Sequence, residues 1–80
     1  MKITSVKIVG SGVVYGIKLF EIQAQYEGKA RPVRGQVFLS DLRRESGNAR
    51  LSLAATKQAT EWLNTQPGLA LVEKEIGLRI

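Results

Sequence analysis

Residues 20–26, FEIQAQY, alternate strictly between apolar and polar side chains. Successive side chains of a β-strand point to opposite faces of a sheet, so this segment is expected to bury one face and expose the other. The apolar set is Phe20, Ile22, Ala24 and Tyr26, and the polar set is Glu21, Gln23 and Gln25. The alternation therefore predicts a half-buried strand and, with it, a sheet that has one solvated face.

The strand prediction extends toward the N-terminus to cover residues 13–26, with Gly16 marking a bulge or a close backbone approach. A further strand is predicted at residues 2–9, KITSVKIV, which alternate in the same way. Between the two, the sequence Gly-Ser-Gly at residues 10–12 predicts a hairpin turn, because glycine accepts positive φ angles without a steric penalty.

The residues on the C-terminal side predict a third strand. Residues 27–29, Glu-Gly-Lys, have the composition of a hairpin tip, and the strand follows at residues 31–40, RPVRGQVFLS. Pro32 has no N–H to donate to a neighbouring strand. We therefore expect this end of the third strand to lie at an edge or outside the sheet.

The second half of the chain predicts a helix over residues 48–66, which begins at an asparagine N-cap and carries apolar side chains at helical spacing. Its start is left open, because residues 50–53 also alternate as a strand would. Residues 41–45 fit either one helical turn, capped by Ser40 and ended by Gly47, or an irregular loop.

Residues 69–80 follow a Pro-Gly pair and predict a final strand. Lys74 interrupts its apolar face, and an unpaired buried ammonium group is costly, so Lys74 indicates a strand end or an error in the register. The predicted fold class is α+β: an antiparallel-rich sheet of about four strands in the order β-β-β-α-β, with one helix packed on one face. Residues 1–80 are expected to form a single small domain.

The face of the sheet away from the helix is predicted to be mixed in charge. It carries one aromatic side chain and three carboxylates, whereas sheets that stack single-stranded bases use two or three aromatics in a basic field. We therefore expect an ordinary solvated face. Its residues are Lys7, Glu21, Gln23, Gln25, Arg34, Gln36, Phe38, Glu73 and Glu75.

The composition argues against several kinds of chemistry. The chain has no Cys and no His, so it lacks disulfides, the ligands of zinc and haem sites, and the usual general base at neutral pH. The glycines of residues 10–16 do not match a GxGxxG phosphate cradle. No apolar run is long enough to span a membrane, and the N-terminus does not have the pattern of a signal peptide. We therefore expect a cytoplasmic, non-catalytic protein with no cofactor and no metal.

A net charge of +5 indicates affinity for polyanions, with twelve Lys and Arg residues against seven acids. Five of the six arginines lie between residues 31 and 50, in two segments that are both expected to be exposed. The alternative is that these arginines only solvate loops, with Asp41 and Glu45 partly neutralising the second segment. The candidate binding residues are Lys29, Arg31, Arg34, Arg43, Arg44 and Arg50.

Two functions from different classes fit these observations. The first is a nucleic-acid-binding accessory protein that contacts the phosphates of DNA or RNA through its arginine-rich loops. The second is a protein-binding module or inhibitor that uses the same arginines, or a strand edge, against an acidic surface on a larger partner. Small phage and mobile-element regulators are common in this size class. A homodimer that covers an open strand edge is a further expectation.

Overall fold

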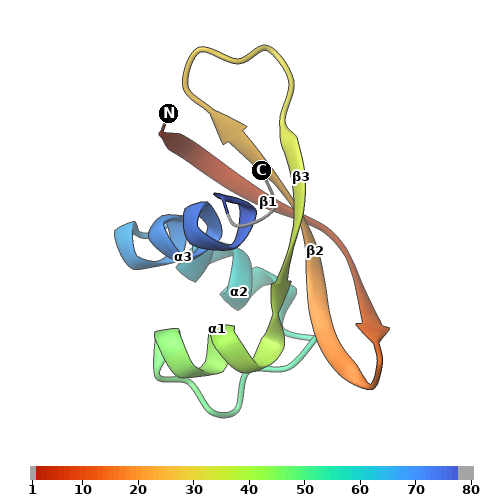
Figure 1. The fold of residues 1–80 in the computed structure, drawn as a ribbon. Helices are drawn as coiled ribbons and strands as arrows, with labels where there is room; N and C mark the ends of the chain where they lie inside the picture. Colours follow the sequence, from red (N-terminus) through yellow and green to blue (C-terminus); the bar gives the residue numbers. More distant parts are fainter. Residues whose placement is uncertain (1, 78–80) are drawn as a thin grey trace.

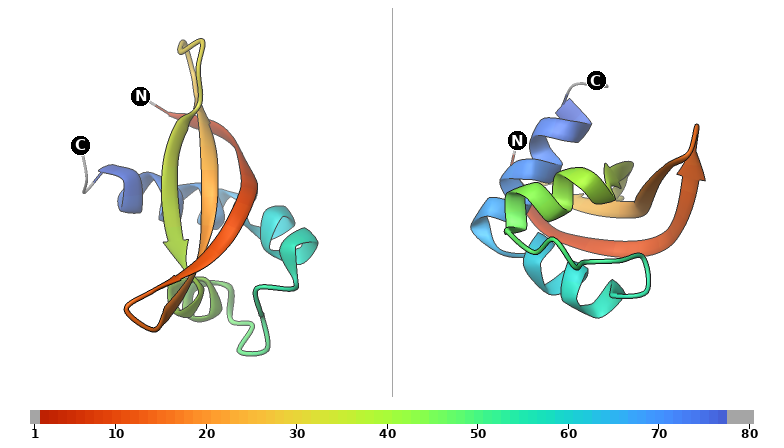
Figure 2. Two further views of the ribbon diagram at one scale, coloured as in Figure 1. Left: turned by 90° about the vertical axis from the view of Figure 1, so that its right-hand side faces the viewer. Right: turned by 90° about the horizontal axis from the view of Figure 1, so that it is seen from below.

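Three antiparallel strands form one sheet, and three helices follow them along the chain (Figure 1). The computed structural model describes residues 2–77. Its elements are β1 (Ile3–Val14), β2 (Ile17–Tyr26), β3 (Val33–Phe38), α1 (Leu39–Ser46), α2 (Thr56–Leu63) and α3 (Gln66–Gly77). The helices lie on one side of the sheet, whose other face is open in the left view of Figure 2. The α+β class is confirmed, but the described residues contain no fourth strand.

The predicted alternation of β2 is confirmed. Phe20, Ile22 and Ala24 are each 0% exposed, whereas Glu21 between them is exposed. In the ladder, Ile22 pairs with Ile8 of β1 on one side and with Gly35 of β3 on the other. Since directly paired residues of antiparallel strands share a face, β2 sets which residues of both neighbours turn toward the helices.

The predicted turn at residues 10–12 is wrong, because these residues continue β1. The chain reverses at Tyr15 and Gly16, which have φ angles of +50° and +77°, and Val14 pairs with Ile17 across the turn. Positive φ at both central residues is the signature of a type I′ hairpin turn, whose twist matches that of the flanking strands. The predicted strand over residues 13–26 is therefore divided between β1 and β2.

The second hairpin is confirmed at its predicted position, with a loop over residues 27–32. Gly28 has a φ of +80°, and the N–H of Lys29 donates to the carbonyl of Tyr26 at 3.2 Å. β3 begins at Val33, one residue after Pro32, and it ends at Phe38. Pro32 is thus excluded from the ladder, as its missing N–H requires.

Of the two alternatives for residues 41–45, the helical one is confirmed by α1. Gly47, with a φ of +71°, follows as the C-cap, a position at which glycine is favoured. Ser40 is not the N-cap, because α1 begins one residue earlier and Phe38 occupies the capping position without a side-chain hydrogen bond. α1 buries Leu39 and Leu42 against the lower end of the sheet (Figure 1).

α2 is shorter than predicted, because residues 48–55 form a loop. Asn48 does not cap a helix: its Oδ1 accepts a hydrogen bond from the backbone N–H of Arg50 at 3.1 Å, which closes a local turn. The apolar pattern still identified the buried side, since Leu51 is 3% exposed and both Ala59 and Leu63 are 0% exposed. The loop therefore contributes Leu51 to the core without being helical.

The predicted final strand is wrong, because residues 66–77 form α3, while residues 78–80 lie outside the described residues. Lys74 falls on the exposed side of α3, which removes the conflict that a strand created. Pro67 lies in the first turn, where backbone N–H groups have no partner within a helix. The buried residues, spaced three and four apart as on one helix face, are Gly68, Leu71, Val72 and Ile76.

Gly68 allows α2 and α3 to approach each other closely. A Cβ at this position would lie 2.2 Å from the carbonyl oxygen of Trp62 and 2.5 Å from the Cα of Leu63. Thr65 caps α3, because its Oγ1 accepts a hydrogen bond from the N–H of Gly68 at 3.4 Å. The Pro-Gly pair therefore serves the start and the packing of a helix.

Asn64 joins the helices to the outer edge of β1. Its Oδ1 accepts a hydrogen bond from the N–H of Val6 at 2.9 Å, and its Nδ2 donates to the carbonyl of Val6 at 2.8 Å. Nδ2 also donates to the carbonyl of Thr60 at 2.8 Å, which anchors the side chain to α2. Because an edge strand leaves such groups without a partner strand, the amide of Asn64 replaces a neighbouring strand at Val6.

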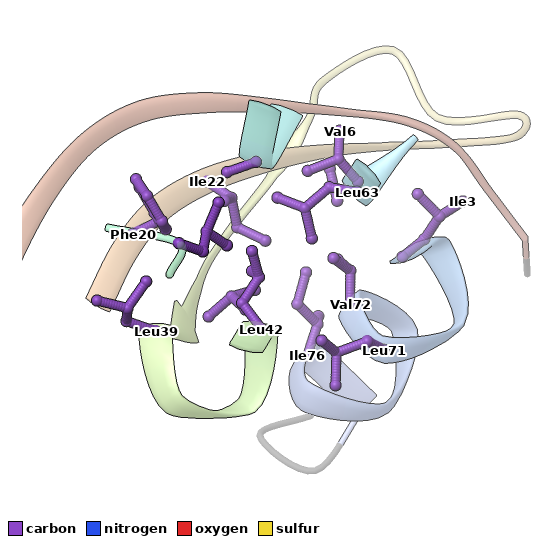
Figure 3. Close-up of a cluster of buried hydrophobic side chains, with 14 of the residues drawn as sticks. Ile3, Val6, Phe20, Ile22, Leu39, Leu42, Leu63, Leu71, Val72 and Ile76 are labelled. Carbon is purple, nitrogen blue, oxygen red and sulfur yellow. The ribbon is translucent and has the colours of Figure 1, made fainter. Parts of the chain in front are cut away.

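The core lies between the sheet and the helices, and side chains from all six elements contribute to it (Figure 3). Ile76 of α3 packs over Gly35 of β3, where a Cβ would lie only 2.8 Å from Cγ1 of Ile76. α3 can therefore reach β3 because that strand has no side chain at this point. The labelled members in Figure 3 are Ile3, Val6, Phe20, Ile22, Leu39, Leu42, Leu63, Leu71, Val72 and Ile76.

We expect Gly68→Ala to destabilise the domain by about 3 kcal/mol, because the added methyl group would collide with backbone atoms of α2. Gly77→Ala, in the same helix, is the matched control, since no atom lies within 4 Å of the position that its methyl group would take. Urea unfolding followed by Trp62 fluorescence should show a lower midpoint for Gly68→Ala only. Equal midpoints for the two variants would contradict the close helix contact.

Asn64→Ala should lower the free energy of unfolding by about 1–2 kcal/mol, because two backbone groups of Val6 lose their partner. Asn64→Asp should lower the free energy of unfolding further than Asn64→Ala does at neutral pH, because a carboxylate would face the carbonyl oxygen of Val6. At acidic pH the protonated carboxyl group can donate to that carbonyl, so the difference between the two variants should become smaller. Gln58→Ala on the exposed side of α2 is the control. Thermal unfolding measures all three, and a Tm of Asn64→Asp equal to wild type at neutral pH would refute the interaction.

Candidate functional site

The two arginine segments lie at opposite ends of the sheet. Lys29 and Arg31 belong to the loop between β2 and β3, at the top of Figure 1, whereas Arg43 and Arg44 belong to α1 at the bottom. β3 runs between them, and its six residues correspond to roughly 20 Å at ~3.3 Å per residue. The predicted candidate residues therefore do not converge on one patch.

The arginines of the lower segment are largely engaged within the domain. Nε of Arg43 donates to the carbonyl of Leu51 at 2.6 Å, which holds the loop before α2 against α1. Arg44 lies 2.9 Å from Oδ1 of Asp41 and 3.6 Å from Oε1 of Glu45. Arg50 is exposed on the loop that follows. Arg43 thus has a structural role, and the charge of Arg44 is partly neutralised. Partial neutralisation by Asp41 and Glu45 is what the alternative of solvating arginines predicts for this segment.

The open face of the sheet differs from its predicted composition. Glu73 and Glu75 belong to α3, so they are not on the sheet at all. Of the three carboxylates that were expected to make the face mixed in charge, only Glu21 remains. The prediction of a mixed face depended on the fourth strand, and it is corrected together with that strand.

Three polar residues form a row across all three strands on the open face. Gln23 of β2 pairs with Lys7 of β1 and with Arg34 of β3, so the three side chains share this face. The Cα atoms of Lys7 and Arg34 lie two interstrand spacings apart, about 10 Å. Both cations are exposed, and neither makes an ion pair with any residue in the described part of the chain. We call Lys7, Gln23 and Arg34 the basic row.

The loop between β2 and β3 adds two more cations beside the basic row. Nε2 of Gln25 donates to the carbonyl of Lys29 at 2.6 Å. Because Gln25 points to the open face, this bond holds the start of the loop on that side of the sheet. Lys29 and Arg31 are exposed and have no ion-pair partner within residues 2–77. The basic row together with Lys29 and Arg31 is named the basic surface.

The surplus positive charge resides in the sheet half of the molecule. Residues 2–38 hold six Lys and Arg side chains and two carboxylates, whereas residues 39–77 hold five of each. No acid occurs before Glu21. Glu21 extends over β1, since a Cβ on Gly10 would lie 2.9 Å from its Oε2. The two carboxylates of this half are therefore Glu21, on the open face, and Glu27, in the same loop as Lys29 and Arg31.

A second feature of the open side is an apolar hairpin end. The last row in which all three strands pair joins Gly12, Leu19 and Phe38. Beyond it β1 and β2 continue without β3, and they extend away from α2 and α3 in both figures. We call this two-stranded extension, residues 13–18, the arm. Its apolar residues are Val13, Val14, Tyr15 and Ile17, all of them exposed.

From the sequence, Lys7, Gln23 and Arg34 are all expected on the open face and Arg34 is a candidate binding residue, but the face as a whole is predicted to be mixed in charge. The arm is not predicted, because residues 13–18 are included in the second strand. One signal is present for the arm, because VVYGI has no polar residue at alternate positions and so lacks the pattern of a strand with one wet face.

Comparison with models of protein families, with curated proteins and with solved structures finds no match to this chain. Within the described residues, no helix has the length and apolar character needed to cross a membrane. No group of three acidic side chains in the same residues could hold a metal ion. The function is therefore inferred from the surface itself.

We expect Arg43→Gln to lower the free energy of unfolding by about 1–2 kcal/mol, because the carbonyl of Leu51 would lose a charge-assisted hydrogen bond. Arg44→Gln removes the same charge one residue later, yet exposed ion pairs contribute little, so its effect should stay below about 0.5 kcal/mol. Urea titration of the two variants measures the difference. A larger loss for Arg44→Gln would reverse the assignment of Arg43 as the structural residue.

Proposed function

We propose that this domain is a non-catalytic nucleic-acid-binding protein that contacts phosphates through the basic surface on the open face of its sheet. The observation that carries the proposal is the basic row. It places Lys7 and Arg34 about 10 Å apart on a face that no helix covers, with no carboxylate paired to either. Polyanion binding requires cations that are available in this way, because each phosphate contact releases a counterion.

The residues of the basic surface have complementary roles in this proposal. Arg34 and Arg31 present planar guanidinium groups that suit phosphate oxygens, and Lys7 and Lys29 act as point charges. Gln23 lies between the two cations of the row, where its amide can donate to a phosphate or to a base edge. Arg43, Arg44 and Arg50 have a lesser part, because two of them already bind groups within the domain.

No chemical step belongs to the proposal. The chain has neither His nor Cys, and the hollow between β1 and β3, lined by Val9, Glu21 and Arg34 among others, opens to solvent on the sheet face. A cytoplasmic location is part of the same proposal, since that compartment offers nucleic acid as a partner. Both DNA and RNA fit a surface that contacts phosphates.

A second candidate function is binding to a protein with an acidic surface. The position of β3 at the edge of the sheet favours it, because the strand order is β1-β2-β3 and β2 is the one strand of the described residues that pairs with β3. A partner strand could add to this edge, and Arg31 and Arg34 would lie beside its acidic side chains. A complex that forms in nuclease-treated solution, is weakened by Arg34→Gln and is abolished by Arg34→Pro would favour this function.

The salt dependence of binding tests the nucleic-acid proposal. Fluorescence anisotropy with labelled duplex DNA, duplex RNA and single strands should show binding at low salt. If four cations each neutralise one phosphate, log K against log salt should have a slope of about −3 to −4. The double variant Lys7→Gln/Arg34→Gln should make the slope shallower by about 2, because two contacts are lost.

Lys57→Gln/Lys74→Gln is the matched control. It changes the net charge by the same amount, but both lysines are exposed on α2 and α3, on the far side of the sheet. Its slope should equal that of wild type. Absence of binding to every nucleic acid at low salt, or equal slopes for the two double variants, would refute the proposed surface.

A further inference from the structure

The arm places four apolar side chains in solvent at the far end of the sheet. Tyr15 is 99% exposed, and Val13, Ile17 and Val14 are 59%, 48% and 42% exposed. Val14 and Ile17 pair directly, so they share one side of the arm, whereas Val13 pairs with Lys18 on the other side. The side with Val14 and Ile17 adjoins Phe38, which is half-buried, and Leu19, which is buried at 1% exposure. Apolar groups gathered in this way mark a contact surface, whereas single exposed apolar residues do not.

The identity of residue 15 is not explained by folding. Tyr15 adopts a φ of +50°, a conformation that a non-glycine residue with a bulky side chain rarely adopts. The first position of a type I′ turn favours Asn, Asp or Gly. At 99% exposure the ring packs against nothing in the domain, so no internal contact offsets the unfavourable backbone conformation. A residue that opposes the local rule without a gain in stability points to a function outside the fold.

The charged residues around the arm indicate what kind of partner it binds. Lys18 pairs with Val13 on the arm, and a groove at its base is lined by Ile17, Lys18 and Arg43. No carboxylate occurs in residues 2–20. A second copy of the chain is a poor partner for the arm, because it would bring the same positive charge. The four apolar side chains also offer less than the ~800 Å² that each partner of a stable complex buries. An anionic partner with apolar groups accessible in a groove fits better.

We propose, resting on the function proposed above, that the arm enters the major groove of duplex DNA while the basic surface contacts the phosphates beside that groove. The major groove, about 12 Å wide, admits a two-stranded β-ribbon, and thymine methyl groups line it. Tyr15, Val14 and Ile17 then lie against base edges at the end of the ribbon. Lys7 is eight residues from Tyr15, at most about 26 Å along the strand, which is less than one helical turn of ~34 Å.

This arrangement assigns separate tasks to the two parts of the open side. The basic surface contributes the salt-dependent part of the affinity, because it releases counterions. The apolar side chains of the arm contribute a part that does not depend on salt. RNA duplexes have a deep and narrow major groove that excludes the arm. The contribution of the arm should therefore appear with duplex DNA and not with duplex RNA.

Tyr15→Asn tests the proposal, because asparagine suits the turn conformation while it removes the ring. Its Tm should equal or exceed that of wild type. Its affinity for duplex DNA should fall by about tenfold at every salt concentration, with the slope of log K against log salt unchanged. Val14→Thr/Ile17→Thr, which keeps β-branched side chains on the exposed arm, should show the same pattern.

The outcomes separate this inference from the function on which it rests. If wild type binds no nucleic acid, both fail. If wild type binds and Lys7→Gln/Arg34→Gln weakens binding, while Tyr15→Asn binds duplex DNA as wild type does, only the inference on the arm is refuted. An equal loss by Tyr15→Asn on duplex RNA would also overturn groove entry. So would sedimentation that shows Tyr15→Asn abolishing self-association without a change in DNA affinity.

Discussion

The side-chain amide of Asn64 fixes the relation between the helices and the sheet. It donates to and accepts from the backbone of Val6 at 2.8 and 2.9 Å, and it is itself held by the carbonyl of Thr60 at 2.8 Å. A single residue at the end of α2 thus takes the place of a missing fourth strand at the edge of β1. The close contact at Gly68 then directs α3 across the same face of the sheet, toward Ile76 and Gly35. These contacts hold α2 and α3 over one face, α1 follows β3 onto the same side, and the other face remains open (Figure 2).

The open face is the face of the sheet that the three helices do not cover. From Phe20 onward β2 alternates, so that Phe20, Ile22 and Ala24 supply the core and Gln23 supplies the basic row. The buried side chains of the strands lie on the side of the helices, except for Leu19, which has the phase of the open side and is 1% exposed. The polar residues of the open side are therefore available for binding without loss of packing. Tyr15 extends this separation, because its conformation opposes folding and its ring contacts only solvent.

The sequence was sufficient for those elements whose pattern admits a single period. FEIQAQY alternates without exception, and β2 follows that phase. Residues 69–76 are different, because apolar residues at 69, 71, 72 and 76 satisfy a helix at least as well as a strand. Lys74 was the signal that decides between them, since only a helix turns it outward. The turn at Tyr15 could not be predicted, because Gly-Ser-Gly five residues earlier has stronger turn composition and tyrosine rarely adopts positive φ.

The ambiguity between helix and strand also affected the prediction of the site. The density of arginine between residues 31 and 50 was visible in the sequence, but the direction of β3 separates its two halves, and Leu51 and Asp41 engage Arg43 and Arg44. Assigning Glu73 and Glu75 to a strand placed two carboxylates on the open face and led to the prediction that this face is mixed in charge. Once they belong to α3, the face retains one acid against Lys7 and Arg34. The charge predicted for the open face, which is built from the N-terminal half, therefore depended on whether residues near the C-terminus were assigned to a strand or to a helix. In a small α+β domain, charged residues therefore have to be placed on a particular face before a binding partner can be inferred from them.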